Sequence, residues 1–154
     1  MNPRTSVETL LEIQHLYAAQ SHAIDTGDAE AWADTFTTFG TFDSPTYDAP
    51  VRGRAALAAF ARQLHAAAPH LHHVITNVLV EAADEPSEYN VRATLLIVTT
   101  HDLTSGAARI DRITTIQDRL RRTPHDPNDL RLVHRRVTRD GEPLPTAPHS
   151  KELS

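Results

Sequence analysis

The hydrophobic pattern of the chain changes near Pro69, and this change constrains the fold more than any other feature of the sequence. Upstream of Pro69, apolar residues recur with the spacing of one helix face, about every 3.6 residues. Downstream, apolar runs and apolar–polar alternation are typical of strands, and turn residues separate them. A run of helices followed by a run of strands predicts an α+β domain.

Three helices are predicted before the change of period. Residues 5–8 offer a capping box for the first helix, and Gly27 ends it. Asp28 then caps a short second helix, on which Trp32 and Phe36 lie one turn apart. An alanine-rich segment gives the third helix. The apolar faces of the first and third helices consist of Leu10, Ile13, Tyr17, Ile24, Leu57, Phe60, Ala61 and Leu64.

Four long strands are predicted after the change of period. They cover residues 71–82, 89–101, 108–121 and 130–139. Turn clusters separate them, including one at 124–128. A shorter β-prone, aromatic segment at 36–43 precedes the third helix and leads into a proline-containing loop. We therefore expect a single domain over residues 1–141 and a flexible tail over residues 142–154.

Composition excludes several classes of protein. A chain of 154 residues with 40% apolar residues can bury one core, whereas two full domains would need a longer chain. The formal net charge of −5 argues against nucleic-acid binding, which rewards a basic face. Because the chain has no cysteine, packing must hold the fold without disulfides. The sequence has neither an apolar leader nor a membrane-spanning stretch, so we expect a cytoplasmic protein without nucleic-acid or membrane partners.

The sequence offers no motif for a bound cofactor. It lacks a glycine-rich phosphate loop, a dinucleotide fingerprint and a serine nucleophile elbow. It has ten histidines, but no His-x-x-x-His pair stands near a carboxylate on a helix face. His70 and His72 alternate on one strand face and could bind zinc weakly, without an evident third ligand. We predict no metal and no cofactor.

The dipeptide His72-His73 stands at the head of the first long strand. On strict alternation, one face carries Leu71, His73, Ile75 and Leu79, and the other carries His72, Val74, Val78 and Val80. Both faces are apolar, so alternation leaves open which imidazole points inward. Asp25, on the last turn of the first helix, could form an acid/base pair with one of them. Both residues also have a structural interpretation, because Asp near Gly makes local turn bonds and a strand histidine often lies at the surface.

Six segments of the chain together resemble the SnoaL-like branch of the nuclear transport factor 2-like superfamily. That superfamily includes scytalone dehydratase, bile acid dehydratase, ketosteroid isomerase and polyketide cyclases. The resemblance extends to about residue 140 and rests on Tyr17, residues 23–28, residues 42–44, residues 52–54, residues 72–77 and residues 132–137. It implies a cone-shaped α+β barrel, in which three N-terminal helices pack on a curved, mainly antiparallel sheet and enclose an apolar pocket.

The resemblance also implies a catalytic pair. In scytalone dehydratase-like proteins, an acid at the end of the first helix works with a histidine that begins the strand after the third helix. Asp25 and His73 occupy these places. In this interpretation Asp25 orients His73, which moves the proton.

The same resemblance suggests residues that surround a substrate. The substrate-binding residues expected on this basis are Tyr17, Trp32, Asp43, Tyr47 and His101. The family has a tyrosine just before the acid, where this chain has Ile24, so that role is missing or falls to Tyr17 or Tyr47. His101 is nearest to a second family histidine, and Asp43 lies near a family tyrosine position without matching it.

We therefore expect a cofactor-independent enzyme, a dehydratase, isomerase or cyclase acting on a small apolar, aromatic or polyketide-like cyclic substrate. The alternative is a ligand-binding or assembly module, such as the small subunit of a ring-hydroxylating dioxygenase. An epoxide hydrolase would need an Asp-Arg-Asp relay, which Asp111 and Arg112 do not supply by themselves. An enzyme should keep an open pocket with Asp25 facing His73, whereas a module should fill it. We also expect a homodimer, because exposed strand faces in this fold often pair.

Overall fold

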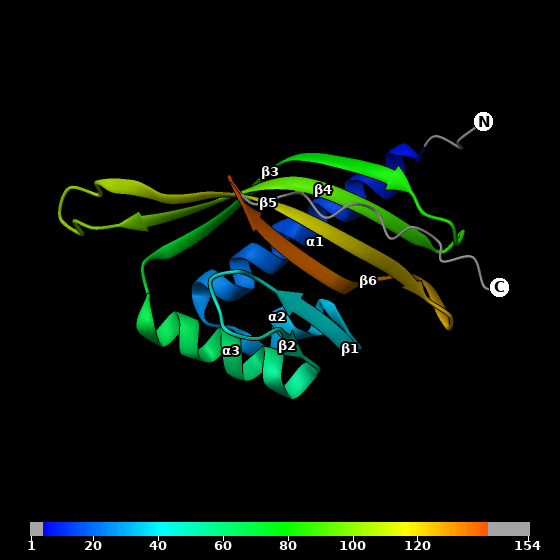
Figure 1. Cartoon of the computed structure of the whole chain (residues 1–154), viewed down its shortest axis with the longest axis horizontal. Coiled ribbons are helices and arrows are strands. Elements are labelled where there is room, and N and C mark those ends of the chain that lie inside the picture. Colours follow the sequence, from blue (N-terminus) through cyan, green and yellow to red (C-terminus); the bar gives the residue numbers. More distant parts are fainter. Residues whose placement is uncertain (1–4, 142–154) are drawn as a thin grey trace.

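The computed structural model describes residues 5–141 and places three helices against one face of a six-stranded sheet (Figure 1). The predicted flexible tail lies outside the described residues. In chain order the elements are α1 (Val7–Thr26), α2 (Ala29–Asp34), β1 (Phe36–Asp43), β2 (Val51–Arg52), α3 (Arg54–Ala67), β3 (Leu71–Ala82), β4 (Glu88–Thr100), β5 (Ala108–Thr123) and β6 (Asp126–Arg139). None of these helices is long and apolar enough to cross a bilayer.

The strands follow the order β2-β1-β6-β5-β4-β3 across the sheet. The β1·β6 pair is parallel, and the other pairs are antiparallel. The predicted α+β fold is confirmed. Within the described residues, however, β2 and β3 are edge strands that do not pair with each other, so the sheet is open rather than closed into a barrel.

Helix α1 begins one residue later than the capping-box prediction required. Ser6 is the N-cap, and its hydroxyl accepts a hydrogen bond of 3.1 Å from the backbone N–H of Thr9. The helix ends at Gly27 as predicted, where φ is +84°. A Cβ at Gly27 would also lie 2.7 Å from the ring of His65 on α3. Glycine is required there by backbone conformation and by the close approach of α3.

Helix α2 is shorter than predicted. Its N-cap is Asp28, which accepts a 3.1 Å bond from the backbone N–H of Ala31. It ends at Asp34, so Phe36 begins β1 instead of sharing a helix with Trp32. The two rings still contact each other edge to face, with centroids 5.1 Å apart. The contact therefore joins the last turn of α2 to the first residue of β1.

Strands β5 and β6 continue to a tight connection at Pro124 and His125. Asp126 already pairs with Thr123, so the longer turn predicted at 124–128 is wrong. The two-residue strand β2 was not predicted, because so short a segment carries no alternation. It pairs with the end of β1 and forms the opposite edge of the sheet from β3.

A β-bulge at Asn77 changes the face that β3 turns toward the helices. Thr76 pairs with Thr94 but Leu79 pairs with Arg92, so β3 holds one extra residue, and Asn77 has a φ of +54°. Before the bulge, Leu71, His73 and Ile75 face the helices; after it, Val78 and Val80 do. Strict alternation over the whole strand was therefore wrong, and Leu79 is exposed.

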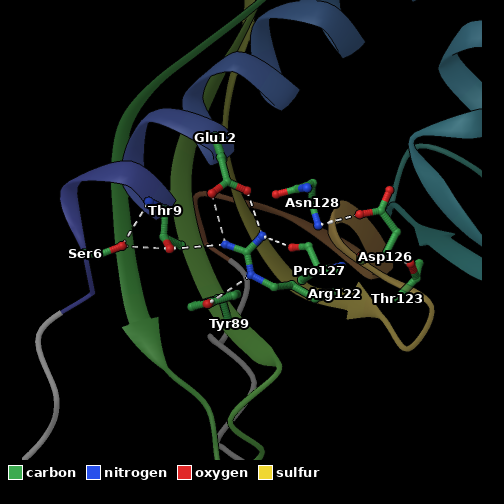
Figure 2. Close-up of polar contacts among 9 residues, drawn as sticks. All are labelled: Ser6, Thr9, Glu12, Tyr89, Arg122, Thr123, Asp126, Pro127 and Asn128. Carbon is green, nitrogen blue, oxygen red and sulfur yellow. Dashed lines mark hydrogen bonds and ion pairs between the residues drawn. The ribbon is translucent and has the colours of Figure 1, made fainter.

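Arg122, near the end of β5, fixes the first half of α1 to the sheet (Figure 2). Its guanidinium donates to the Glu12 carboxylate at 2.7 and 3.2 Å, to the Thr9 hydroxyl at 3.2 Å and to the Pro127 carbonyl at 2.7 Å. The pKa of Arg122 is raised, chiefly by its hydrogen bond to Glu12. This contact holds one end of α1, while the other end carries Asp25.

Candidate active site

Asp25 and His73 form a close pair between the last turn of α1 and the start of β3. The imidazole Nδ1 of His73 lies 2.7 Å from Asp25 Oδ1. The backbone N–H of His73 also donates to both carboxylate oxygens, at 3.1 and 3.0 Å. The carboxylate thus holds both the ring and the backbone of His73. The two side chains are 12% and 15% exposed.

This arrangement determines the state of the imidazole. An ionised carboxylate only accepts hydrogen bonds, so in neutral His73 the proton sits on Nδ1 and Nε2 carries the free lone pair. Among residues 5–141, Nε2 of His73 takes part in no hydrogen bond. It is therefore the nitrogen that can take a proton from a bound molecule.

The structure distinguishes the two adjacent histidines. The side chain of His72 is 58% exposed, and its Nδ1 lies 3.8 Å from Asp25 Oδ2. His73 is the one that points toward the helices. The pairing of β3 with β4 over residues 71–76 fixes this orientation, because it precedes the bulge at Asn77.

His73 lines a small, mainly apolar pocket between the helices and the sheet. The pocket lining consists of Ile24, Trp32, Phe42, Ser44, Thr46, Tyr47, Phe60, Leu64, Leu71, His73, Leu95, Ile97, Arg112, Thr114, Arg135 and Val137. Aromatic rings form one wall, and Phe60 contacts Trp32, Phe42 and Tyr47 at centroid distances of 5.7, 5.1 and 4.9 Å. Such a wall suits a flat or cyclic molecule.

A second, more open cavity runs between α1 and β3, and we call it the groove. Its lining residues include Gln14, Tyr17, His22, Asp25, His72, His73 and Val78. Asp25 lines the groove but not the pocket, whereas His73 lines both. The pair therefore stands between the apolar pocket and a solvent-open surface.

A buried polar cluster that the sequence analysis missed reaches the same pocket. Arg135 on β6 donates to Asp118 on β5 through Nε at 2.9 Å and Nη2 at 2.7 Å. The Tyr17 hydroxyl donates to the same carboxylate at 2.6 Å. Burial lowers the pKa of Arg135, but Asp118 and Tyr17 together raise it by more. The net pKa lies above the ordinary value, so the guanidinium stays charged. Arg135 lines the pocket; Asp118 and Tyr17 do not.

A signal for this cluster was present in the sequence. Asp118 is in phase with the buried Ile116 and Leu120, and Arg135 is in phase with the buried Val137. A charge inside an apolar stripe on each of two neighbouring strands indicates a buried ion pair.

The remaining predicted substrate-binding residues divide into two groups. Trp32 and Tyr47 line the pocket. Tyr17 does not line it and instead donates a hydrogen bond to Asp118. Asp43 ends β1 beside β6 and does not line the pocket. His101 is exposed where β4 leaves the sheet, and its backbone N–H bonds to Ala107 across the hairpin. Neither Asp43 nor His101 lines the pocket; His101 lies beyond it because β4 and β5 extend past it.

The structure shows how the side chains that could bind a metal lie relative to one another. Within residues 5–141, no three His, Asp or Glu side chains come close enough together to hold a metal ion. Asp111, considered above for a relay, bonds to Arg109 and Thr99. Among residues 5–141, the buried Arg135 has one carboxylate partner, Asp118, in place of the two that an Asp-Arg-Asp relay needs.

Comparisons with known proteins agree with this architecture. An NTF2-like protein with a cystatin-like fold from Novosphingobium aromaticivorans is 27% identical over 88% of this chain and 85% of its own, with a TM-score of 0.75. A Catenulispora acidiphila protein in complex with S-DNPA is 28% identical over 88% and 96%, with a TM-score of 0.74. A proposed aromatic ring hydroxylase from Novosphingobium aromaticivorans is 25% identical over 88% and 92%, with a TM-score of 0.73.

No curated protein matches the chain. The family model described as the SnoaL-like domain matches residues 5–136, which is most of the sequence. The match covers α1 with Asp25, β3 with His73, and both strands of the Asp118–Arg135 pair. The chain therefore belongs to the SnoaL-like domain family.

Proposed function

We propose that this protein is a small-molecule enzyme that uses Asp25 and His73 as an acid/base pair. The observation that carries the proposal is the 2.7 Å contact between Asp25 and Nδ1 of an imidazole that lines an open apolar pocket. General acid/base catalysis needs a group that titrates near neutral pH, and histidine does so. A carboxylate that orients an imidazole at a cavity wall is the arrangement that acid/base catalysis uses.

In the proposed reaction, Nε2 of His73 takes a proton from the carbon next to a substrate carbonyl. Asp25 keeps the Nδ1 proton in place and stabilises the imidazolium that forms. The electron pair of the broken C–H bond moves into the enolate. If the imidazolium then protonates a leaving hydroxyl group, water departs, which is dehydration. If the proton returns to another carbon, the result is isomerisation. If the enolate attacks a second carbonyl, a C–C bond closes the ring and the imidazolium protonates the alkoxide that forms.

The pocket supports a cyclic or polyketide-like substrate. Its lining is mainly apolar and aromatic, and it lies beside the proposed base. The complex of the Catenulispora acidiphila relative with S-DNPA is consistent with ligand binding in this fold. None of the three reactions requires a cofactor, because each begins with a proton transfer.

The shared first step gives one experiment for all three reactions. Hydrogen–deuterium exchange at the carbon next to the carbonyl is followed by NMR in heavy water, with α-tetralone and a ring carboxylate of α-tetralone as probes. The protein should accelerate exchange of at least one probe. His73→Gln should lower the enzymatic rate at least about 100-fold, and Asp25→Asn at least about tenfold.

His72→Gln is the matched control, because His72 is adjacent but mostly exposed. It should retain the wild-type rate within about twofold. Melting temperatures of all variants are measured in parallel to separate catalysis from folding. Equal exchange rates in wild type and His73→Gln would refute the acid/base proposal.

The second candidate is an assembly module like the small subunit of a ring-hydroxylating dioxygenase. Exposed apolar side chains on the sheet face away from the helices favour it, and the similar structure described as a proposed aromatic ring hydroxylase is compatible with it. Such a module would associate through this face and show no exchange activity that depends on His73.

A further inference from the structure

The charges in the pocket point to a class of substrate that the acid/base pair alone does not specify. Within the described chain, the lining residues include two arginines and no Asp or Glu. This contrasts with the net charge of −5 of the whole chain. A pocket of positive charge in an acidic protein is a specific feature of the site and not a consequence of composition.

Arg112 is the more exposed of the two arginines and lies at the rim. It takes part in no hydrogen bond or ion pair among residues 5–141. Its neighbour Asp111 bonds to Arg109 at 2.7 Å and to Thr99 through its other oxygen, and interacts with Arg112 only through its charge. Arg112 also acts on the pocket interior, since its charge opposes the burial that raises the pKa of Tyr47. It is a cation beside the pocket that makes no hydrogen bond or close ion pair with the described residues.

Arg135 is the buried arginine and lies inside the pocket. Nε and Nη2 bind Asp118, but Nη1 makes no hydrogen bond among the described residues. Among residues 5–141, Gln20 Oε1 is the one fully buried side-chain polar atom that lacks a hydrogen-bond partner. Because Nη1 also lacks a partner but is not in this class, it is not fully buried. Asp118 fixes the guanidinium plane, so Nη1 is a preorganised donor in a water-poor site.

We propose that the pocket selects a cyclic substrate that carries a negative charge, such as a carboxylate or an acidic phenol. Arg112 meets the charged group at the rim, and Arg135 Nη1 donates to the substrate carbonyl oxygen on which negative charge develops. This inference rests on the proposed function, because the carbonyl is the one whose neighbouring carbon loses its proton to His73. Arginine suits both tasks, since its guanidinium remains charged in an apolar environment.

Isothermal titration calorimetry with the full chain tests the charge preference without any turnover. The probes are naphthoate and its uncharged ketone counterpart acetonaphthone, which share the ring system. Naphthoate should bind at least about tenfold more tightly, and added salt should reduce the difference. Arg112→Gln should weaken naphthoate binding about three- to tenfold and leave acetonaphthone within about twofold, and Arg112→Lys should restore most of the loss.

Arg92→Gln is the control, because Arg92 is also exposed and makes no ion pair in the described chain, but lies outside the pocket. It should change neither affinity. The inference is overturned if wild type binds acetonaphthone as tightly as naphthoate, if naphthoate does not bind at millimolar concentration, or if Arg112→Gln and Arg92→Gln behave alike.

The two proposals fail separately. A preference for the ketone together with His73-dependent exchange would overturn the anionic substrate and leave the acid/base enzyme standing. Tight naphthoate binding that depends on Arg112, together with an exchange rate that His73→Gln does not change, would overturn the acid/base enzyme and leave the anionic ligand standing.

Discussion

Asp118 and Arg135 carry opposite charges where water hardly reaches. Their side chains are 0% and 5% exposed. Desolvating each ion costs several kcal/mol, which only good geometry and further hydrogen bonds can offset. Both are present here, because Tyr17 donates to Asp118 and its ring lies 5.4 Å from the Arg135 guanidinium carbon. Tyr17 therefore supports the pocket arginine from behind.

Tyr17→Phe should remove part of the alkaline instability of the protein. Burial, followed by the charge of Asp118, raises the pKa of Tyr17 well above its ordinary value of 10.0. As pH rises above about 10, the unfolded chain releases this proton while the native chain keeps it. The native state then binds more protons, so its unfolding free energy falls with rising pH, by up to about 1.4 kcal/mol per pH unit from this residue.

Urea denaturation between about pH 9 and about pH 11 measures this effect. Tyr17→Phe should be less stable than wild type at the lower pH, because Asp118 loses a donor, but its stability should decline less steeply. Parallel declines in the two proteins would show that Tyr17 is not the group responsible.

At the scale of single elements, β3 positions His73, and its bulge keeps the strand packed against the helices. Its first residues turn His73 toward α1, and the bulge at Asn77 keeps the rest of the strand packed on the same side. Without the extra residue, Leu79 would turn inward in place of Val78 and Val80. The bulge therefore preserves burial on both sides of the register shift.

Asn77→Val should destabilise the fold by about 1–2 kcal/mol, although valine is a good strand former. Asn77 has a φ of +54°, which a β-branched residue adopts only with strain. Asn77→Gly, which tolerates this conformation, should stay close to wild type. Urea midpoints measure both. If Asn77→Val were as stable as Asn77→Gly, the left-handed backbone at this position would not be needed.

For the whole molecule, the sheet face away from the helices carries an apolar row that we define as Val74, Leu96 and Ile113. These residues are paired neighbours across β3, β4 and β5. Val74 is 42% exposed and Ile113 is 55% exposed. An exposed apolar row of this kind favours association with a second copy of the chain. This supports the proposed homodimer.

We propose that this row is the interface of a homodimer, so Ile113→Glu should give a monomer, because it would place a charge in the apolar interface. Light scattering after size-exclusion chromatography measures the mass, and circular dichroism checks the fold. Leu103→Glu is the control, since Leu103 is 68% exposed but lies in the β4–β5 hairpin connection, outside the row. A wild-type monomer, or dissociation by both variants, would refute the proposed interface.

The sequence by itself determined most of the elements and the fold class. Helical spacing before Pro69, alternation after it, Gly27 as the end of α1 and Asp28 as the cap of α2 are local properties, and local backbone preferences decide them. The resemblance to SnoaL-like proteins then brought Asp25 and His73 together as an expected pair. Neighbouring residues and a shared pattern suffice for such inferences.

Only the tertiary structure decided how the strands and charges combine. The bulge at Asn77, the ion pair of Asp118 with Arg135, and the position of His101 beyond the pocket depend on which strands pair and in what register. The register depends on how much apolar surface the whole sheet buries, and no short segment of the sequence determines that amount. For this reason the contact between Asp25 and His73 was foreseen, whereas the arginines that line the adjacent pocket were not.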